Sequence, residues 1–129
     1  MVVAEAVVLL PLVGLLVRRR GYNATKEWLG RHSVPGPAGT TPHHGRPVAE
    51  AVALVAGRRI TETRCLVRSL VVWFLVRRRG EQAEVVIGAP LLDSGRLSAH
   101  AWVEVAQVPI TDPADVRERF PVLAPRSDL

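Results

Sequence analysis

The stretch Ser98–Val105 (SAHAWVEV) constrains the fold more than any other part of the chain. Apolar and functional side chains alternate along it. The odd positions are Ala99, Ala101, Val103 and Val105, and the even positions are His100, Trp102 and Glu104. Alternation with a period of two predicts a β-strand with one buried face. The other face then carries an imidazole, an indole and a carboxylate, which makes this strand a candidate carrier of chemistry.

A second candidate for chemistry is Cys65, the one cysteine of the chain. Apolar residues recur at helical spacing across residues 64–76, which predicts a core helix with Cys65 in its first turns. The positive end of a helix dipole favours a thiolate, so this position suits a nucleophile. The alternative is that Cys65 is a small buried hydrophobe, which is the usual fate of a free cysteine.

Asp112 can complete a set of nucleophile, base and orienting group with Cys65 and His100. Its position depends on the hairpin between the His100 strand and the apolar run 108–111. A two-residue turn at 106–107 makes Asp112 point away from His100. A three-residue connection places the two residues opposite each other, about 5 Å apart.

The catalytic interpretation of Asp112 therefore requires the three-residue connection or an equivalent bulge. A second interpretation needs neither, because Asp112 directly precedes Pro113 and a predicted short helix over 113–120. Aspartate is a favoured N-cap, and proline suits the first helical position. The two roles use different oxygens of the carboxylate and are compatible.

The order of the predicted elements is typical of an α+β domain, with helices first and an antiparallel sheet after them. We expect N-terminal helices and the Cys65 helix to pack on a small antiparallel sheet. The expected divisions are a helical segment at 1–30, a flexible Pro/Gly-rich loop at 31–46, a core at 47–123 and a tail at 124–129. Within the core, Pro47 is expected to open a helix, and further strands are predicted at 83–87 and 108–111.

The charge of the chain admits two classes of partner. Its formal net charge of +5 comes mainly from arginine and attracts nucleic acid or acidic peptides equally. Two triple-arginine clusters, Arg18–Arg20 and Arg77–Arg79, each precede a glycine. This pattern is typical of a solvated helix end, and a nucleic-acid stripe is the alternative. The single cysteine excludes an internal disulfide and indicates a reducing, cytoplasmic setting.

The first apolar stretch, Val2–Val17, contains Glu5, Pro11 and Gly14. It is shorter than the roughly twenty apolar residues of a membrane span. Its positive charges follow it, whereas those of a signal peptide come first. We expect a helix, kinked or divided at Pro11, that is buried in the domain or covered by a partner. Contact with a membrane surface is the alternative.

The histidines of the predicted loop, His32, His43 and His44, suggest a metal site. They have no cysteine or carboxylate at ligand spacing, so we expect no bound metal. On the His100 strand, Trp102 is expected either to wall the site or to pack in the core. Glu104 is expected to be solvated or paired with an arginine. Glu104 and Asp93 are the alternative orienting groups should Asp112 face away from His100.

Taken together, the strings Cys65–Leu70 (CLVRSL), Val86–Gly88 (VIG), Ala99–Glu104 (AHAWVE) and Asp112 resemble the leader peptidase of lasso-peptide biosynthesis. That family is a compact branch of the transglutaminase-like, papain-related cysteine peptidases. The resemblance covers residues from about 47 to 123, in order and at similar spacing. It implies that Cys65 is the nucleophile, His100 the base and Asp112 the orienting group.

The resemblance also implies a function. The chain would remove the leader of a ribosomally made precursor peptide as the peptidase half of a split pair. A separate leader-recognition protein would present the substrate, and an ATP-dependent cyclase would take the released core. No cofactor, metal or nucleic acid is implied. The alternatives are a noncatalytic transglutaminase-like module that binds a peptide or partner, a basic nucleic-acid binder, and acyl transfer to an amine.

Overall fold

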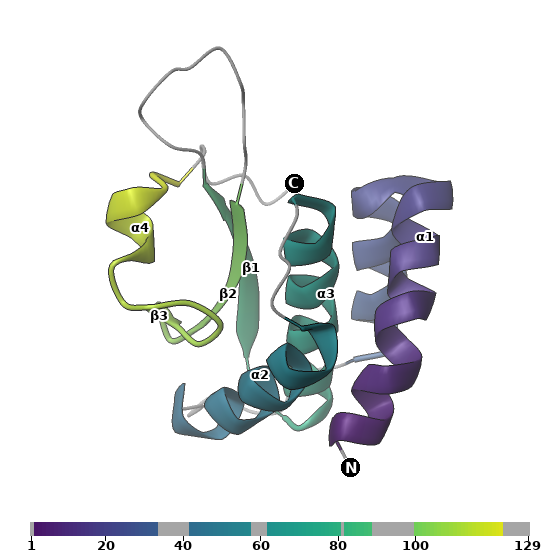
Figure 1. Cartoon of the computed structure of the whole chain (residues 1–129), viewed down its shortest axis with the longest axis horizontal. Helices are drawn as coiled ribbons and strands as arrows, with labels where there is room; N and C mark the ends of the chain where they lie inside the picture. The colour runs from purple at the N-terminus through teal and green to yellow at the C-terminus, as the bar shows by residue number, and fades with distance from the viewer. Residues whose placement is uncertain (1, 34–41, 58–61, 81, 89–99, 123–129) are drawn as a thin grey trace.

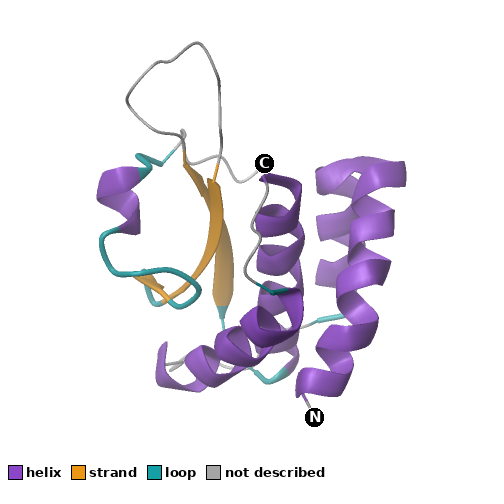
Figure 2. Ribbon diagram, viewed as in Figure 1, coloured by secondary structure: helices purple, strands orange, loops and turns teal. Residues whose placement is uncertain are grey.

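The computed structural model describes residues 2–33, 42–57, 62–80, 82–88 and 100–122. Its elements are α1 (Val2–Arg31), α2 (Pro42–Ala56), α3 (Glu62–Arg78), β1 (Ala83–Gly88), β2 (His100–Val105), β3 (Val108–Pro109) and α4 (Val116–Arg119). Helix α3 lies between α1 and the sheet, and α4 lies on the opposite side of the sheet (Figure 1). Helices precede an antiparallel sheet, which confirms the predicted α+β class (Figure 2).

Helix α3 is the centre of the main core. Residues 69–76 are buried without interruption, as expected for a helix covered on several sides. It packs against α1, α2 and the sheet, and the Trp73 indole Nε1–H donates to the carbonyl of Ala83 at 2.9 Å. The prediction of a Cys-bearing core helix over 64–76 is therefore confirmed, with two residues added at each end.

The sheet has the order β1-β2-β3, with both pairings antiparallel. Gly88 of β1 lies opposite His100 of β2, and Ala83 lies opposite Val105. One face of β2 was predicted to be buried, but residues 101–105 are buried on both faces. The reason is a second, smaller core, in which Trp102 packs with Val86 and Val116 on the α4 side.

Helix α1 is divided at Gly21, where the backbone has φ of 82°. This agrees with the predicted helix end after Arg20, because glycine adopts positive φ without steric cost. The helix, expected to be kinked or divided at Pro11, is not divided there, because the proline lies inside it. Between residues 2 and 31, Gly21 alone has non-helical angles.

Helix α2 begins at Pro42, five residues before the predicted start at Pro47. Residues 42–46 of the predicted loop are therefore helical. Gly45 shows the physical reason, because a Cβ added there would lie 2.8 Å from the Cδ1 of Ile110. The missing side chain lets this turn of α2 pack closely on Ile110, and tertiary packing outweighs local propensity. Arg31 of that loop belongs to α1, and residues 34–41 lie outside the described residues.

The second triple-arginine cluster joins α3 to α1. Arg77 donates to the hydroxyl of Ser33 at 3.1 Å and lies over the Trp73 ring. Arg79 forms a 2.9 Å ion pair with Glu5. Arg77 and Arg79 therefore make contacts within the chain. Arg18–Arg20 are exposed, and so are Arg78 and Arg79.

The C-terminal elements are shorter than predicted. The strand expected over 108–111 ends at Pro109, and the helix expected over 113–120 covers Val116–Arg119. Both differences arise because the chain turns away from the sheet after residue 110, as described for the site below. The predicted loop 91–97 with Asp93, the start of the His100 strand at 98–99 and the tail 124–129 lie outside the described residues.

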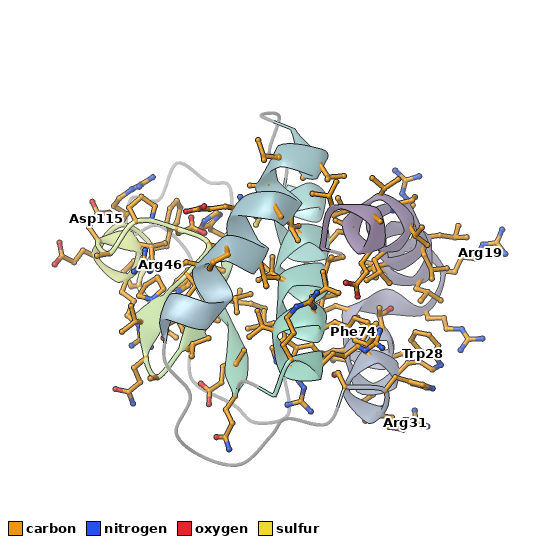
Figure 3. All side chains as sticks on the ribbon, turned by 90° about the horizontal axis from the view of Figure 1, so that it is seen from below. Arg19, Trp28, Arg31, Arg46, Phe74 and Asp115 are labelled. Atoms are coloured by element: carbon orange, nitrogen blue, oxygen red, sulfur yellow. The ribbon has the colours of Figure 1, made fainter. Side chains whose placement is uncertain are left out.

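Helix α1 also presents an apolar surface to solvent, called here the outer face of α1. Its members are large hydrophobic residues of the first half of the helix: Val3, Val7, Val8, Leu12 and Leu15. Arg19 and Trp28 also point away from the rest of the molecule on the α1 side (Figure 3). Within the described ranges, the structure contains no helix whose length and hydropathy would let it cross a bilayer.

Candidate active site

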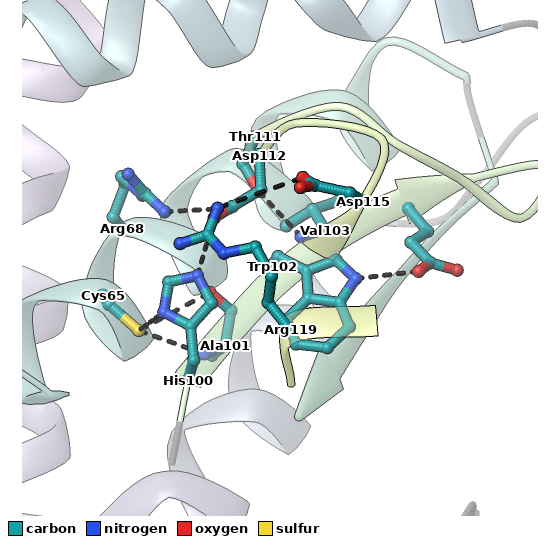
Figure 4. Close-up of polar contacts among 11 residues, drawn as sticks. Cys65, Arg68, His100, Ala101, Trp102, Val103, Thr111, Asp112, Asp115 and Arg119 are labelled. Carbon is teal, nitrogen blue, oxygen red and sulfur yellow. Dashed lines mark hydrogen bonds and ion pairs between the residues drawn. The ribbon is translucent and has the colours of Figure 1, made fainter. Parts of the chain in front are cut away.

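Cys65 lies in the first turn of α3, and its side chain faces β2 (Figure 4). The sulfur is 3.4 Å from Nδ1 of His100. It also accepts a hydrogen bond from the backbone N–H of Ala101 at 3.1 Å. Cys65 is buried, with 2% of its surface exposed. The thiol also lies within donating distance of the Ala101 carbonyl, at 3.5 Å. The backbone of Ala101, the imidazole of His100 and the first turn of α3 thus all meet at the sulfur.

The N–H of Ala101 is free to bond the sulfur because β3 is short. The β3 strand pairs with residues 104 and 105 of β2, and the pairing does not reach Ala101. A buried backbone donor without a strand partner needs another acceptor. The sulfur of Cys65 is that acceptor. The site therefore forms where β3 ends beside β2 and where α3 begins.

His100 contacts Cys65 through one ring nitrogen and Asp112 through the other. Its Nε2 lies 2.6 Å from Oδ2 of Asp112. The hydrogen bond with Asp112, and next the one with Cys65, raise the pKa of His100 to about 9, although burial opposes the shift. The imidazole is therefore protonated near neutral pH, and both N–H groups donate, one to the sulfur and one to the carboxylate.

The hairpin has the shorter of the two turns considered from the sequence. Val105 lies opposite Val108, so the turn has two residues, and both Ala106 and Gln107 have positive φ. The three-residue connection is absent, so the catalytic interpretation of Asp112 depends on the alternative, a departure equivalent to a bulge. In a regular hairpin of this register Asp112 would face away from His100.

The chain leaves the ladder after Ile110, and this departure brings Asp112 to His100. Ile110 still donates its N–H to the carbonyl of Val103 at 2.9 Å. The N–H of Val103 then bonds the side-chain oxygen of Thr111 at 3.0 Å, where a strand would offer a backbone carbonyl. The Thr111 hydroxyl thus replaces the backbone carbonyl that would accept the next hydrogen bond of the sheet, and the backbone turns so that Asp112 points back toward β2. Like the bulge considered from the sequence, this departure brings Asp112 and His100 to the same side.

Asp112 does not cap the last helix. The N-cap position of α4 is Asp115, and no side-chain capping bond is formed there. The carboxylate of Asp112 is instead held by His100, Arg68 and Thr111. Burial by itself would raise the pKa of Asp112. The hydrogen bond and charge of His100, the charge of Arg68 and the hydrogen bond of Thr111 together hold the pKa below its usual value.

Arg68 and Thr111 are site residues that the sequence predictions missed. Arg68 donates to Oδ1 of Asp112 at 3.2 Å, and the Thr111 hydroxyl donates to the same oxygen at 3.0 Å. One signal for Arg68 was present in the sequence, since it is a charged residue inside an apolar helix, and buried charges need partners. No sequence signal marks Thr111, because its role depends on where the chain leaves the sheet.

Trp102 and Glu104, which share a face with His100, form a network behind the imidazole. Trp102 is fully buried, and its ring centroid is 5.8 Å from that of His100. The indole Nε1–H donates to Glu104 at 2.7 Å, and Arg117 binds both oxygens of Glu104 at 2.8 and 2.6 Å. Phe120 also contacts His100, with ring centroids 4.7 Å apart. Glu104 is thus paired with an arginine.

Metal ligation finds no support in the part of the chain that the structure describes. Across these residues, no three His, Cys, Asp or Glu side chains are grouped as ligands of an ion would be. Nδ1 of His32 lies 2.8 Å from the carbonyl of Trp28. His43 and His44 belong to the first turn of α2, and their side chains lie outside the described set.

A thiol, an imidazole and a carboxylate in hydrogen-bonded series, on helices packed against a small antiparallel sheet, define a papain-like class of α+β proteins. Comparison with known families makes the assignment more specific, because the transglutaminase-like superfamily matches residues 7–124. The chain belongs to the transglutaminase-like superfamily. The match includes most of α1, so this helix is part of the family domain. No curated protein and no solved structure matches the chain.

Proposed function

We propose that the protein is a cysteine peptidase with Cys65 as nucleophile, His100 as base and Asp112 as orienting group. The observation that carries the proposal is the continuous series Cys65 Sγ–His100–Asp112, with contacts of 3.4 and 2.6 Å, in a member of the transglutaminase-like superfamily. The raised pKa of His100 supports a thiolate–imidazolium pair as the resting state near neutral pH.

In this reaction the sulfur of Cys65 attacks the carbonyl carbon of the scissile amide. The C–N bond breaks, and the imidazolium of His100 gives its Nδ1 proton to the departing amine. The acyl group stays on the sulfur as a thioester. Water, deprotonated by the now neutral imidazole, then releases the acid and restores the thiolate–imidazolium pair. Asp112 keeps the ring in place and stabilises its charged form at each turnover.

The proposed substrate is the leader-bearing precursor of a lasso peptide, and the leader is the part that is removed. The motifs CLVRSL and AHAWVE and their order support this narrower assignment by resemblance. We further propose that the chain works in the cytoplasm beside a separate leader-recognition protein and an ATP-dependent cyclase. Cys65 is buried in the chain alone, so the sulfur must become accessible when a peptide binds. A protein that holds the leader can supply binding energy for that step.

The experiment is incubation of a precursor peptide from a neighbouring gene with this protein and its recognition partner, followed by mass spectrometry. Cleavage at one amide, lost after alkylation with iodoacetamide, is the expected result. An intact peptide in the presence of the partner would contradict the peptidase assignment and favour a noncatalytic peptide-binding module. Transfer of the acyl group to an added amine would instead assign the chain to acyl transfer.

A further inference from the structure

Arg68 is a charged residue that contacts Asp112 of the Cys65–His100–Asp112 series, and the proposed mechanism leaves it unused. It lies on α3 three positions after Cys65, and residues three apart in a helix share a side. Its side chain has 9% of its surface exposed. The helix that carries the thiol therefore also carries a buried guanidinium toward the same site (Figure 4).

The contacts of Asp112 divide cleanly between its two oxygens. Oδ1 accepts hydrogen bonds from Arg68 at 3.2 Å and from the Thr111 hydroxyl at 3.0 Å. Oδ2 faces Nε2 of His100 at 2.6 Å. With Oδ1 held by two donors from different segments, the carboxylate cannot rotate about its Cβ–Cγ bond without breaking both bonds. Oδ2 is thereby kept in line with the imidazole.

The burial of Arg68 is difficult to explain as a contribution to stability alone. Its Nε is buried and has no hydrogen-bond partner among the described residues. A buried, incompletely bonded guanidinium is destabilising compared with an apolar side chain of similar volume. The surrounding positions of α3 are filled by such side chains, including Val67, Val71 and Val72. A residue kept at this cost has a role in the site.

We propose that Arg68 is a positioning residue that fixes the rotamer and the charge of Asp112, and through Asp112 the orientation of His100. The inference rests on the proposed function, because positioning has a kinetic effect only if the series is catalytic. Arg68 itself need not touch the substrate. It also ties α3 to the 110–112 segment, so that one helix places both the nucleophile and the acid that orients its base.

The charge of Arg68 supports the same role. The charged groups that face Asp112 in the described structure are Arg68 from α3 and His100 from β2. Both stabilise the carboxylate and help to hold the pKa of Asp112 below its usual value. Without Arg68, the carboxylate would be protonated at a higher pH, and the imidazolium would lose its partner under mildly acidic conditions.

The test compares Arg68→Met and Arg68→Lys with the wild type by two independent readouts. The first is the pKa of Asp112, measured by carboxyl ¹³C chemical shift against pH, which requires no peptidase activity. The second is the kcat and KM of precursor cleavage across pH. Arg77→Met is the matched control, because Arg77 lies on the same helix but contacts Ser33 and Trp73, away from the site.

We expect Arg68→Met to raise the pKa of Asp112 and to move the acid limb of the activity profile to higher pH. Its kcat should fall about 10- to 100-fold with KM nearly unchanged, since misplacement of a catalytic group acts on the chemical step. Arg68→Lys keeps the charge and should recover part of kcat. If Arg68→Met does not fold, Arg68→Lys alone tests the inference. A reduced kcat with a normal KM is then the expected result, and a wild-type kcat would contradict the inference.

Any of three results would overturn the inference. The first is an unchanged Asp112 titration in Arg68→Met. The second is a loss of kcat in Arg68→Met no larger than that in Arg77→Met. The third is a loss of kcat in Arg68→Lys as large as that in Arg68→Met. If the wild type itself does not cleave the precursor, the proposed function fails. The titration then still decides whether Arg68 holds Asp112.

Discussion

At the scale of single residues, the site is defined by how two side chains share their hydrogen bonds. His100 uses one nitrogen for the sulfur of Cys65 and the other for Asp112. Asp112 gives one oxygen to His100 and the other to Arg68 and Thr111. Each group is thus oriented by a neighbour on a different element, and the protonated form of His100 is the one that satisfies every partner.

Asp112→Asn tests the charge of the orienting group. The substitution keeps the shape of the side chain but removes the negative charge that stabilises the imidazolium. We expect the cleavage rate to fall by a factor of about 100 or more and the pKa of His100 to fall from about 9 toward its ordinary value. Kinetics and an imidazole NMR titration measure the two effects.

Asp115→Asn is the matched control for that variant. Asp115 is an exposed aspartate near the start of α4 that makes no capping bond. It should leave both the rate and the titration of His100 unchanged. A wild-type rate in Asp112→Asn would remove Asp112 from the mechanism.

The titration of His100 also predicts how stability depends on pH. Its pKa in the folded state is raised above the unfolded value, so its contribution to stability is complete below about pH 6.5. The contribution is lost as the pH rises through about 9. The difference in melting temperature between the wild type and His100→Gln should therefore shrink between these two values. A difference that grew over this range would mean that His100 is neutral in the folded state.

At the scale of elements, the position of Asp112 is set by the segment that follows β3, where the chain leaves the sheet. The turn between β2 and β3 does not set it. The turn has positive φ at both Ala106 and Gln107, a geometry that strongly favours Asn-Gly. Neither residue suits it, so the turn is strained. The contact between His100 and Asp112 is set further along, where the chain leaves the ladder after Ile110.

The double substitution Ala106→Asn, Gln107→Gly separates these two features. It should stabilise the protein by about 1 kcal/mol, because a side chain in left-handed backbone is relieved of steric strain. Cleavage should be unchanged, since the register and Thr111 are untouched. Thermal unfolding and the cleavage assay measure both outcomes. A more stable variant with impaired cleavage would show that the strained turn itself positions Asp112.

The helices and strands near the site could be predicted from the sequence, but the contacts between them could not. Alternation identified β2, and helical spacing identified α3 with Cys65 in its first turn, because both patterns arise from neighbours in sequence. The path from Pro109 to Asp112 depends on one hydroxyl replacing a backbone carbonyl, and periodicity carries no trace of that. The early start of α2 likewise depends on Gly45 meeting Ile110, a residue far away in the chain.

At the scale of the whole molecule, the first half of α1 is apolar on both sides. Its inner side packs on α3 through residues such as Ala6 and Val13, whereas the outer face of α1 meets solvent. A helix that is apolar all round is usually covered on every side. We propose that the leader-recognition protein covers the outer face of α1.

Val8→Asp tests this proposal, since Val8 is 63% exposed at the middle of the outer face of α1. We expect normal folding and at least about a tenfold weaker affinity for the recognition protein, measured by calorimetry. Leu54→Asp is the control, because Leu54 is 81% exposed but lies on α2. Equal affinities for Val8→Asp and the wild type would exclude this surface.

The central claim is that the sulfur of Cys65 takes the acyl group of the substrate. Intact-protein mass spectrometry of an acid-quenched reaction with precursor and recognition partner measures this most directly. The account predicts a wild-type species heavier by the mass of the leader minus one water, which is the thioester, and neither this species nor cleavage in Cys65→Ala. Cleavage by Cys65→Ala at the wild-type rate, with no adduct on the wild type, would contradict it.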